Sequence, residues 1–364
     1  MPEHKNQHFV PRCALKPFSL EGTGKAINVF NVASMRLIKN APVKGQCARD
    51  YLYAKDDLAA EKFLTEIEGR YAAAVRSLSA DEVVTAEQMA LLRLAILIQT
   101  RRTKAAIDEI RKIGELMADK IYANDPSNKP VDARSDREVM WQSMRMAAKA
   151  TSYVDDLKVI VFRNKTSIEF VTCDNPAFLT NRFSFQKLRS SKFGVSNSGA
   201  ILSMPLTPRL SAICYDKGTY NIVNGSGTPF VDLTDDRDAR AINEWQYLNA
   251  NENIYFSHFE DGDRIKSDVG ALAETRAKIT PEAELYVRDD DSAPPAPRGL
   301  VDRYRSGMPE EEAMVKESLL AISFQHPEPS TWPSKIKLRN KPRVYSNGST
   351  GGPVRKAAWL NRRR

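Results

Sequence analysis

Four side chains of this sequence have the chemistry needed to cleave a phosphate ester: His8, Arg101, Asp174 and Asn251. A histidine can accept or donate a proton near neutral pH, and an arginine can hold a phosphate in its planar fork. A carboxylate or an amide can orient the substrate. If the fold gathers these four residues, we expect phosphodiester hydrolysis, and the prediction depends on whether His8, Arg101 and Asp174 meet in one cleft.

Each of these residues also has a structural interpretation. Asp174 opens an Asp-Asn-Pro string, which commonly starts a turn because the short side chain bonds to the backbone two residues on. Arg101 falls at the end of a predicted helix, where a cation complements the helix dipole. His8 fits a hydrogen-bonded histidine in a strand. His4 and His8 would then lie about 13 Å apart, too far to share a metal ion, so neither a metal nor a cofactor is predicted.

The first elements that must position these residues are helices between residues 54 and 151. Two capping boxes, Thr85 with Gln88 and Ser135 with Glu138, mark two helix starts. The run 89–98 is apolar nearly all round, which predicts a helix buried in the centre of a helical layer.

Strands follow the helices. From residue 157 the hydrophobic period becomes two, which predicts hairpins over 157–172 and 200–215, with a helix capped by Thr234 and a strand at 254–256 after them. Helices and antiparallel strands that are segregated along the chain indicate an α+β fold. We therefore expect a helical layer packed on an antiparallel sheet, in one main domain formed by residues 1–258.

The remaining chain differs in composition. Residues 259–324 are predicted to form a helical extension, with a Pro-rich linker near 289–299 and a last helix over 309–322. Residues 325–364 carry ten basic residues and one acid, a net charge of +9, so the rest of the chain accounts for −1 of the total of +8. The segment is rich in Pro and Gly and has no hydrophobic period, which predicts a mostly disordered tail.

The basic tail has three interpretations. Its cations could contact a phosphate backbone, or they could dock on an acidic protein partner. In the third interpretation the segment is a solvated tail, or a tail packed on an acidic face of its own body. The first predicts nucleic-acid-binding residues at Lys335, Lys337, Arg339, Lys341, Arg343, Arg355, Lys356, Arg362, Arg363 and Arg364.

The composition also limits the location of the protein. The longest apolar run has ten residues and includes Arg93, which is too short to cross a membrane. The first residues lack the apolar core of a signal peptide. Four widely spaced cysteines without a Cys-x-x-Cys pair are typical of reduced thiols, so we expect a cytoplasmic protein without a membrane partner.

Five short strings occur in the order that is typical of one protein family. They are His-Phe-Val-Pro at 8–11, Gln-Thr-Arg-Arg-Thr at 99–103, Thr-Cys-Asp-Asn-Pro at 172–176, Pro-Leu-Thr-Pro at 205–208, and residues 249–255. This series resembles the bacterial "domain of unknown function 4238" family over roughly residues 4–258. Lys104 stands where members often have proline, and Cys173 where they often have serine. The resemblance implies a cytosolic bacterial protein and brings no assigned activity.

Two functions therefore follow from the sequence as hypotheses. The first is a bacterial cytosolic protein that acts on or binds nucleic acid, with a nuclease-like hydrolase as its enzymatic version. The second is a non-enzymatic binding or regulatory protein whose basic tail docks on an acidic partner.

Overall fold

The computed structural model describes residues 6–53, 59–123, 126–223, 228–277, 281–286, 319–345 and 352–361. Its helices are α1 (Arg12–Leu15), α2 (Ala59–Ser79), α3 (Ala86–Gln99), α4 (Lys104–Ile121), α5 (Asp136–Ala150), α6 (Asp236–Asn249), α7 (Gly262–Ala271), α8 (Ala273–Ala277) and α10 (Lys356–Asn361). Its strands are β1 (Asn6–His8), β2 (Ala26–Asn31), β3 (Arg36–Pro42), β4 (Ala48–Asp50), β5 (Lys158–Asn164), β6 (Thr172–Cys173), β7 (Phe178–Thr180), β8 (Ile201–Thr207), β9 (Leu210–Tyr215), β10 (Tyr220–Asn221), β11 (Phe230–Leu233), β12 (Asn253–Phe256), β13 (Pro281–Tyr286), β14 (Leu319–Phe324) and β15 (Lys337–Leu338).

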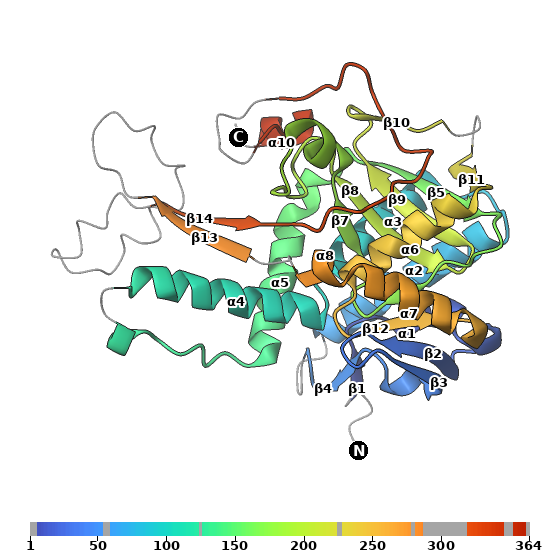
Figure 1. Ribbon diagram of the computed structural model, residues 1–364, viewed down its shortest axis with the longest axis horizontal. Helices are drawn as coiled ribbons and strands as arrows, with labels where there is room; N and C mark the ends of the chain where they lie inside the picture. The colour runs from blue at the N-terminus through green and yellow to red at the C-terminus, as the bar shows by residue number, and fades with distance from the viewer. Residues whose placement is uncertain are drawn as a thin grey trace.

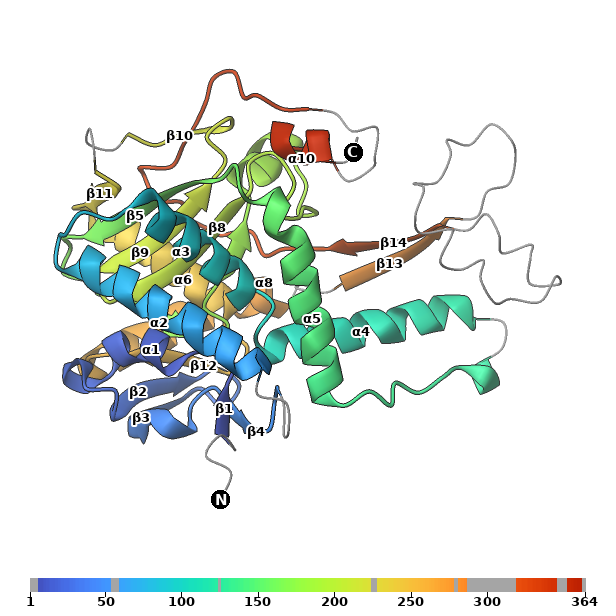
Figure 2. The same cartoon turned by 180° about the vertical axis from the view of Figure 1, so that it is seen from behind.

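A five-stranded sheet in the order β11-β5-β9-β8-β7 forms the centre of the molecule. Helix α6 covers one face (Figure 1), and α3, with α2 beside it, covers the other (Figure 2). The side chains of β5 alternate between the two cores, with Ile160 and Phe162 in one and Val161 in the other. Because both faces of this five-stranded sheet are buried, the strands of the sheet are apolar along most of their length. The α+β prediction is confirmed, although helices cover both faces and β5 pairs with β11 in parallel.

A second sheet, in the order β3-β2-β12-β6, lies against α7. Its strand β12 confirms the strand predicted at 254–256. Strands β1 and β4 form a short antiparallel pair, and His8 is the last residue of β1.

The predicted hairpins had different outcomes. The hairpin over 200–215 is confirmed as the β8–β9 pair. The hairpin over 157–172 is wrong, because β5 pairs with β9 and β11 while β6 pairs with β12 in the other sheet. The cause is a compact polar turn in which Asn164 donates to the Ile168 carbonyl at 2.7 Å and Thr166 donates to Asn164 at 2.8 Å. This turn directs the chain away from β5.

Local helix signals were more reliable. Both capping boxes are present at the starts of α3 and α5, as predicted. Helix α6 begins one residue later than expected, because the carboxylate of Asp235, rather than Thr234, accepts the backbone N–H of Arg237 at 2.9 Å. None of the helices in the described ranges is long and apolar enough to cross a membrane.

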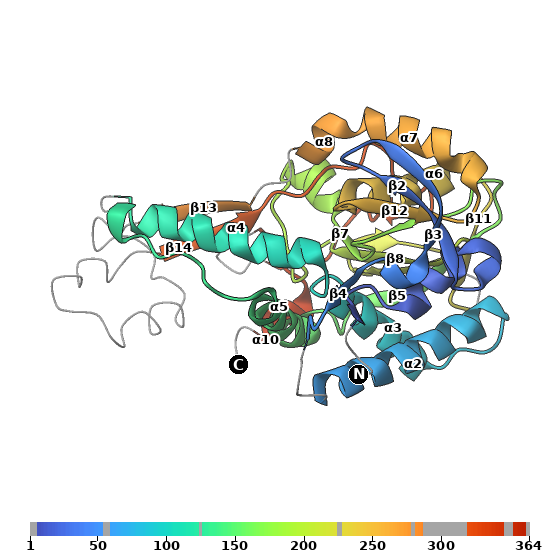
Figure 3. The ribbon, with the colours of Figure 1, turned by 90° about the horizontal axis from the view of Figure 1, so that it is seen from below.

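The predicted helical extension is only partly helical. Helices α7 and α8 are followed by β13 and β14, which pair with each other and project from the body beside α4 (Figure 3). Of the helix predicted over 309–322, residues 309–318 lie outside the described residues and 319–322 are part of strand β14. The Pro-rich linker predicted near 289–299 also lies outside them.

Residues 325–345 and 352–361 form a segment that we call the C-terminal strap. The strap leaves β14, passes α6, pairs with β10 through β15 and ends in α10 (Figure 1). Ile336 of the strap is fully buried in the same core as Trp245. The prediction of disorder is therefore wrong for these residues, because a few apolar side chains and polar anchors hold a segment without any hydrophobic period.

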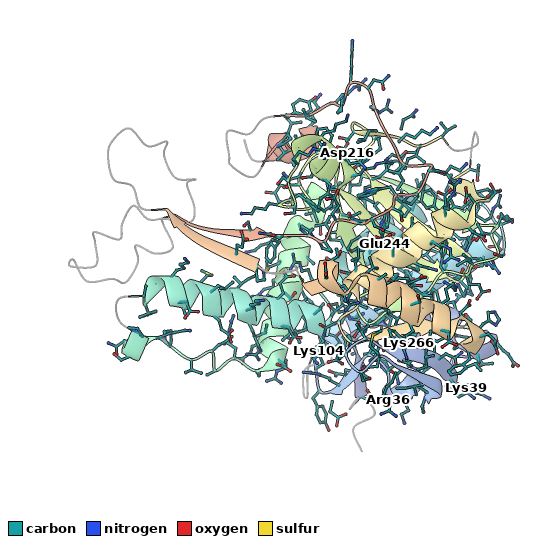
Figure 4. All side chains as sticks on the ribbon, in the orientation of Figure 1. Arg36, Lys39, Lys104, Asp216, Glu244 and Lys266 are labelled. Carbon is teal, nitrogen blue, oxygen red and sulfur yellow. The ribbon has the colours of Figure 1, made fainter. Side chains whose placement is uncertain are left out.

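Two carboxylates of α6 supply polar anchors for the first part of the strap. Glu244 accepts the hydroxyls of Ser330 and Thr331 at 2.9 and 2.8 Å, and Asp238 accepts the backbone N–H and hydroxyl of Ser334 at 2.6 and 2.8 Å. Glu244 is labelled in Figure 4. The described part of the tail thus lies on acidic groups of its own body, which is one of the three interpretations left open by the sequence.

Candidate functional site

A set of hydrogen bonds, which we call the seam, joins four of the five family-like strings: those at 8–11, 99–103, 172–176 and 249–255. Arg102 donates to the His8 carbonyl at 2.9 Å, and Gln99 donates to the Phe9 carbonyl, also at 2.9 Å. Thr103 donates to the side chain of Asn175 at 3.0 Å. The strings at 8–11, 99–103 and 172–176 therefore meet in space, and their polar side chains bind backbone groups and one another across the seam.

Asp174 is the central anchor of this seam. Its carboxylate accepts the backbone N–H groups of Asn251, Glu252 and Asn253 at 2.8, 2.7 and 3.2 Å, and the residue is only 5% exposed. Burial raises the pKa of Asp174 to about 6, while the three backbone N–H groups act in the opposite direction. The carboxylate thus holds the turn between α6 and β12, which is a structural role.

His8 lies on the other side of the seam. The residue lines a cavity of about 160 Å³ together with Arg12, Cys13, Glu68 and Arg102. Burial and the charge of Arg12 lower the pKa of His8, so the imidazole is neutral at pH 7. Burial also raises the pKa of the Cys13 thiol to about 12, so that this neighbour is not a thiolate nucleophile at neutral pH.

Arg101 and Asn251 line a different and larger cavity of about 580 Å³. Arg101 forms an ion pair there with Glu109. The lining of this cavity includes neither His8 nor Asp174. The structure thus brings Asn251 close to two other predicted catalytic residues, because it shares this cavity with Arg101 and donates its backbone N–H to Asp174. His8, the fourth, lines a separate cavity.

The sequence interpretation missed His326, which lines the larger cavity from the strap. Its ring stacks on Phe193 with the centroids 4.1 Å apart, and its Nε2 donates to the Phe193 carbonyl at 2.9 Å. Burial lowers the pKa of His326 to about 4. The residue lies in a Pro-rich segment with no periodic signal, so nothing local marks it as part of a site.

The lowered pKa of His326 predicts a pH dependence of stability. Because the folded protein holds this ring neutral, its stabilising contribution is complete above the ordinary pKa of 6.5 and is lost as the pH falls towards about 4. The loss is about 3 kcal/mol at most. We expect His326→Phe, which can keep the stacking, to show a smaller loss of unfolding free energy over this pH range in urea denaturation.

The variant must be compared with the wild type, because Asp174 titrates in an overlapping pH range. The raised pKa of Asp174 makes the folded protein more stable as the pH falls from about 6 to 3.8, which is opposite to the effect of His326. An identical pH profile for His326→Phe and wild type would contradict the role of this histidine.

The basic residues of the strap fall into two groups. Arg355 is buried, with 2% of its surface exposed, and binds Asp156 and three backbone carbonyls. Lys335 is half-buried. The others that the structure describes are exposed: Lys337, Arg339, Lys341, Arg343 and Lys356. Arg362, Arg363 and Arg364 lie outside the described residues. The prediction that Arg355 contacts nucleic acid is wrong, because its guanidinium is occupied inside the protein.

Metal binding has no candidate site in the part of the chain that the structure describes. Nowhere in the described ranges do three or more His, Cys, Asp or Glu side chains lie close enough together to hold an ion.

Comparison with protein-family models matches residues 6–259 to the family described as "Protein of unknown function (DUF4238)". Neither the curated proteins nor the solved structures gave a match. The family match covers the two larger sheets, the seam and helices α1 to α6, and it ends before β13, β14 and the C-terminal strap. The chain therefore belongs to the DUF4238 family of proteins of unknown function.

Proposed function

We propose that this protein binds nucleic acid through the exposed cations of the C-terminal strap. The observation that carries the proposal is that Lys337, Lys341 and Arg343 are exposed and form no ion pair with any of the residues that the structure describes. The guanidinium Nε of Arg339 donates to the carbonyls of Lys217 and Tyr220, at 2.9 and 3.1 Å, and so leaves the positive charge without a carboxylate partner among the residues that the structure describes. Unneutralised cations on a surface release counterions when they contact phosphates, which favours binding without reading the base sequence.

The enzymatic version of this function has weaker support. Hydrolysis by His8, Arg101, Asp174 and Asn251 requires these groups to act on one substrate, whereas His8 and Arg101 line different cavities and Asp174 is occupied by backbone N–H groups. We therefore propose nucleic-acid binding rather than cleavage.

We also propose a cytoplasmic location in a bacterium. All four cysteines carry free thiols, which is usual for proteins of a reducing compartment.

A pair of matched variants tests the proposal. The strap variant Lys337→Gln/Lys341→Gln/Arg343→Gln removes three exposed cations. The control variant Arg36→Gln/Lys39→Gln/Lys266→Gln removes three exposed cations from β3 and α7, in the lower part of Figure 4 and away from the strap. We expect the strap variant to bind a fluorescent DNA duplex and a single strand about tenfold or more weakly than wild type in fluorescence anisotropy. The control variant should stay close to wild type.

Fluorescence anisotropy also distinguishes nucleic acid from an acidic protein as the partner of the strap. Polyglutamate serves as the probe for an acidic protein partner. Tighter binding of polyglutamate than of either nucleic acid would contradict the proposal and favour an acidic protein. An equal loss in the two variants would show that net charge, and not the strap, controls binding.

A further inference from the structure

The cavity of about 580 Å³ lies between α3, α4 and α5, the C-terminal end of α6, and the start of the strap. Its volume is within the range of sites that bind small molecules in other proteins. It includes residues outside the family match, because Pro281 and the residues from Phe324 to Pro327 complete its wall. The cavity is thus formed jointly by the family domain and the C-terminal part of this chain.

The floor of the cavity is apolar. Leu97 of α3, Phe178 of β7 and Leu248 of α6 line it and are at most 2% exposed. Met146 of α5 lies at the rim and is 40% exposed. A ligand that fills this space must therefore have an apolar body.

One end of the cavity is polar and positively charged. Arg276 donates to the Ala250 carbonyl at 2.6 Å and also to the Tyr247 carbonyl, which fixes its guanidinium at the C-terminal end of α6. Its remaining N–H groups have no protein acceptor among the described residues. Asn251 lines the same cavity, and its hydrogen bond to Asp174 uses only its backbone N–H. Free guanidinium and amide N–H groups are the donors that suit an anionic head.

The charges of the cavity lining indicate how much negative charge a matching ligand would carry. Arg101, Lys112 and Arg276 contribute three positive charges, and Asp108 and Glu109 contribute two negative charges, which leaves +1. A phosphate monoester would bring about two negative charges at pH 7, whereas a carboxylate brings one. The net charge of the lining therefore matches a carboxylate better than a phosphate.

We propose that this cavity is a binding site for a small carboxylic acid with an apolar body. The carboxylate is held by Arg276 and Asn251, and the apolar body lies over Leu97, Phe178 and Leu248. This proposal does not depend on nucleic-acid binding by the strap, because none of the exposed strap cations lines the cavity.

Calorimetric titration of the full chain with naphthalene-2-carboxylate, and with the neutral naphthalene-2-carboxamide, tests the proposal. We expect the carboxylate to bind about tenfold more tightly than the amide, because only the charged head forms charge-assisted hydrogen bonds. Asn251→Leu should reduce this preference. The Asn251 side chain has no partner in the described structure, so the substitution should leave the fold intact.

Two variants of α5 provide a matched comparison. Met146→Glu introduces a carboxylate at the rim of the cavity, and Ala148→Glu introduces the same charge at an exposed position of the same helix that does not line the cavity. We expect Met146→Glu to weaken binding of naphthalene-2-carboxylate about tenfold or more, and Ala148→Glu to leave it within about twofold. Absence of saturable binding by wild type would overturn the proposal. Equal binding of acid and amide, or equal effects of the two α5 variants, would overturn it as well.

Discussion

Replacement of Asp174 by alanine should lower the free energy of unfolding by about 3 to 5 kcal/mol, the largest loss that we expect from a single substitution in the seam. The carboxylate accepts three backbone N–H groups in an environment where it is only 5% exposed. Alanine would leave these donors without an acceptor, and each unpaired buried donor costs about 1 to 3 kcal/mol. Urea denaturation followed by circular dichroism measures the change.

Two further variants separate the loss of acceptors from a general effect of substitution. Asp174→Asn keeps the size and one acceptor oxygen but places an N–H₂ group against the backbone donors, so its stability should lie between those of Asp174→Ala and wild type. Glu82→Ala removes an exposed carboxylate and should change stability by less than about 0.5 kcal/mol. A similar small change for Asp174→Ala would contradict the anchoring role.

Replacement of Arg355 by alanine should cost about 3 to 5 kcal/mol, because it leaves a partner carboxylate and several carbonyls without their donor. Its Nε lies 3.0 Å from both oxygens of Asp156, and its other N–H groups bind the carbonyls of Tyr153, Val195 and Asn197. This single side chain connects the strap to the end of α5 and to the loop before β8. Thermal and urea unfolding of the variant test the expectation.

The adjacent residue provides the control for Arg355. Lys356 is exposed, so Lys356→Ala should change stability by less than about 0.5 kcal/mol. Arg355→Lys keeps the charge but lacks the planar fork that reaches several acceptors at once, and it should recover less than half of the loss. Equal stability of the Arg355→Ala and Lys356→Ala variants would show that the strap is not anchored at this point.

Features of the fold that depend on neighbouring residues were predicted well from the sequence. The capping boxes at Thr85 and Ser135 are confirmed because their donors and acceptors lie within three residues of each other. The β8–β9 hairpin is confirmed for the same reason, since a short turn at Pro208 connects two apolar strands.

Long-range pairing was not predicted, because its causes are distant in the sequence. Strand β5 has the period of a hairpin partner, but its neighbours β9 and β11 are about fifty and seventy residues away, and the Asn164 turn directs the following chain into the other sheet. The strap shows a related failure. Composition predicted disorder, yet Ile336 and Arg355 fit a core and an ion pair that are built by other parts of the chain.

In the candidate site, too, residue types were predicted from the sequence but tertiary contacts were not. The sequence identified Asp174, Arg101 and Asn251 as notable, and all three contribute to the seam or to the larger cavity. It did not indicate that the Asp174 carboxylate is occupied by three backbone N–H groups, since these belong to a turn almost eighty residues away. Residue type suggests possible chemistry, but the available hydrogen-bonding capacity of a side chain depends on tertiary contacts.

The salt dependence of DNA binding tests the central claim most directly. Each phosphate contact that is removed should lower the slope of log K against log salt concentration by about 0.7 to 0.9. We expect the slope for the Lys337→Gln/Lys341→Gln/Arg343→Gln variant to be smaller than that of wild type by about 2 to 3, and the slope of the Arg36→Gln/Lys39→Gln/Lys266→Gln control to be unchanged. Equal slopes for wild type and the strap variant would contradict nucleic-acid binding by the C-terminal strap.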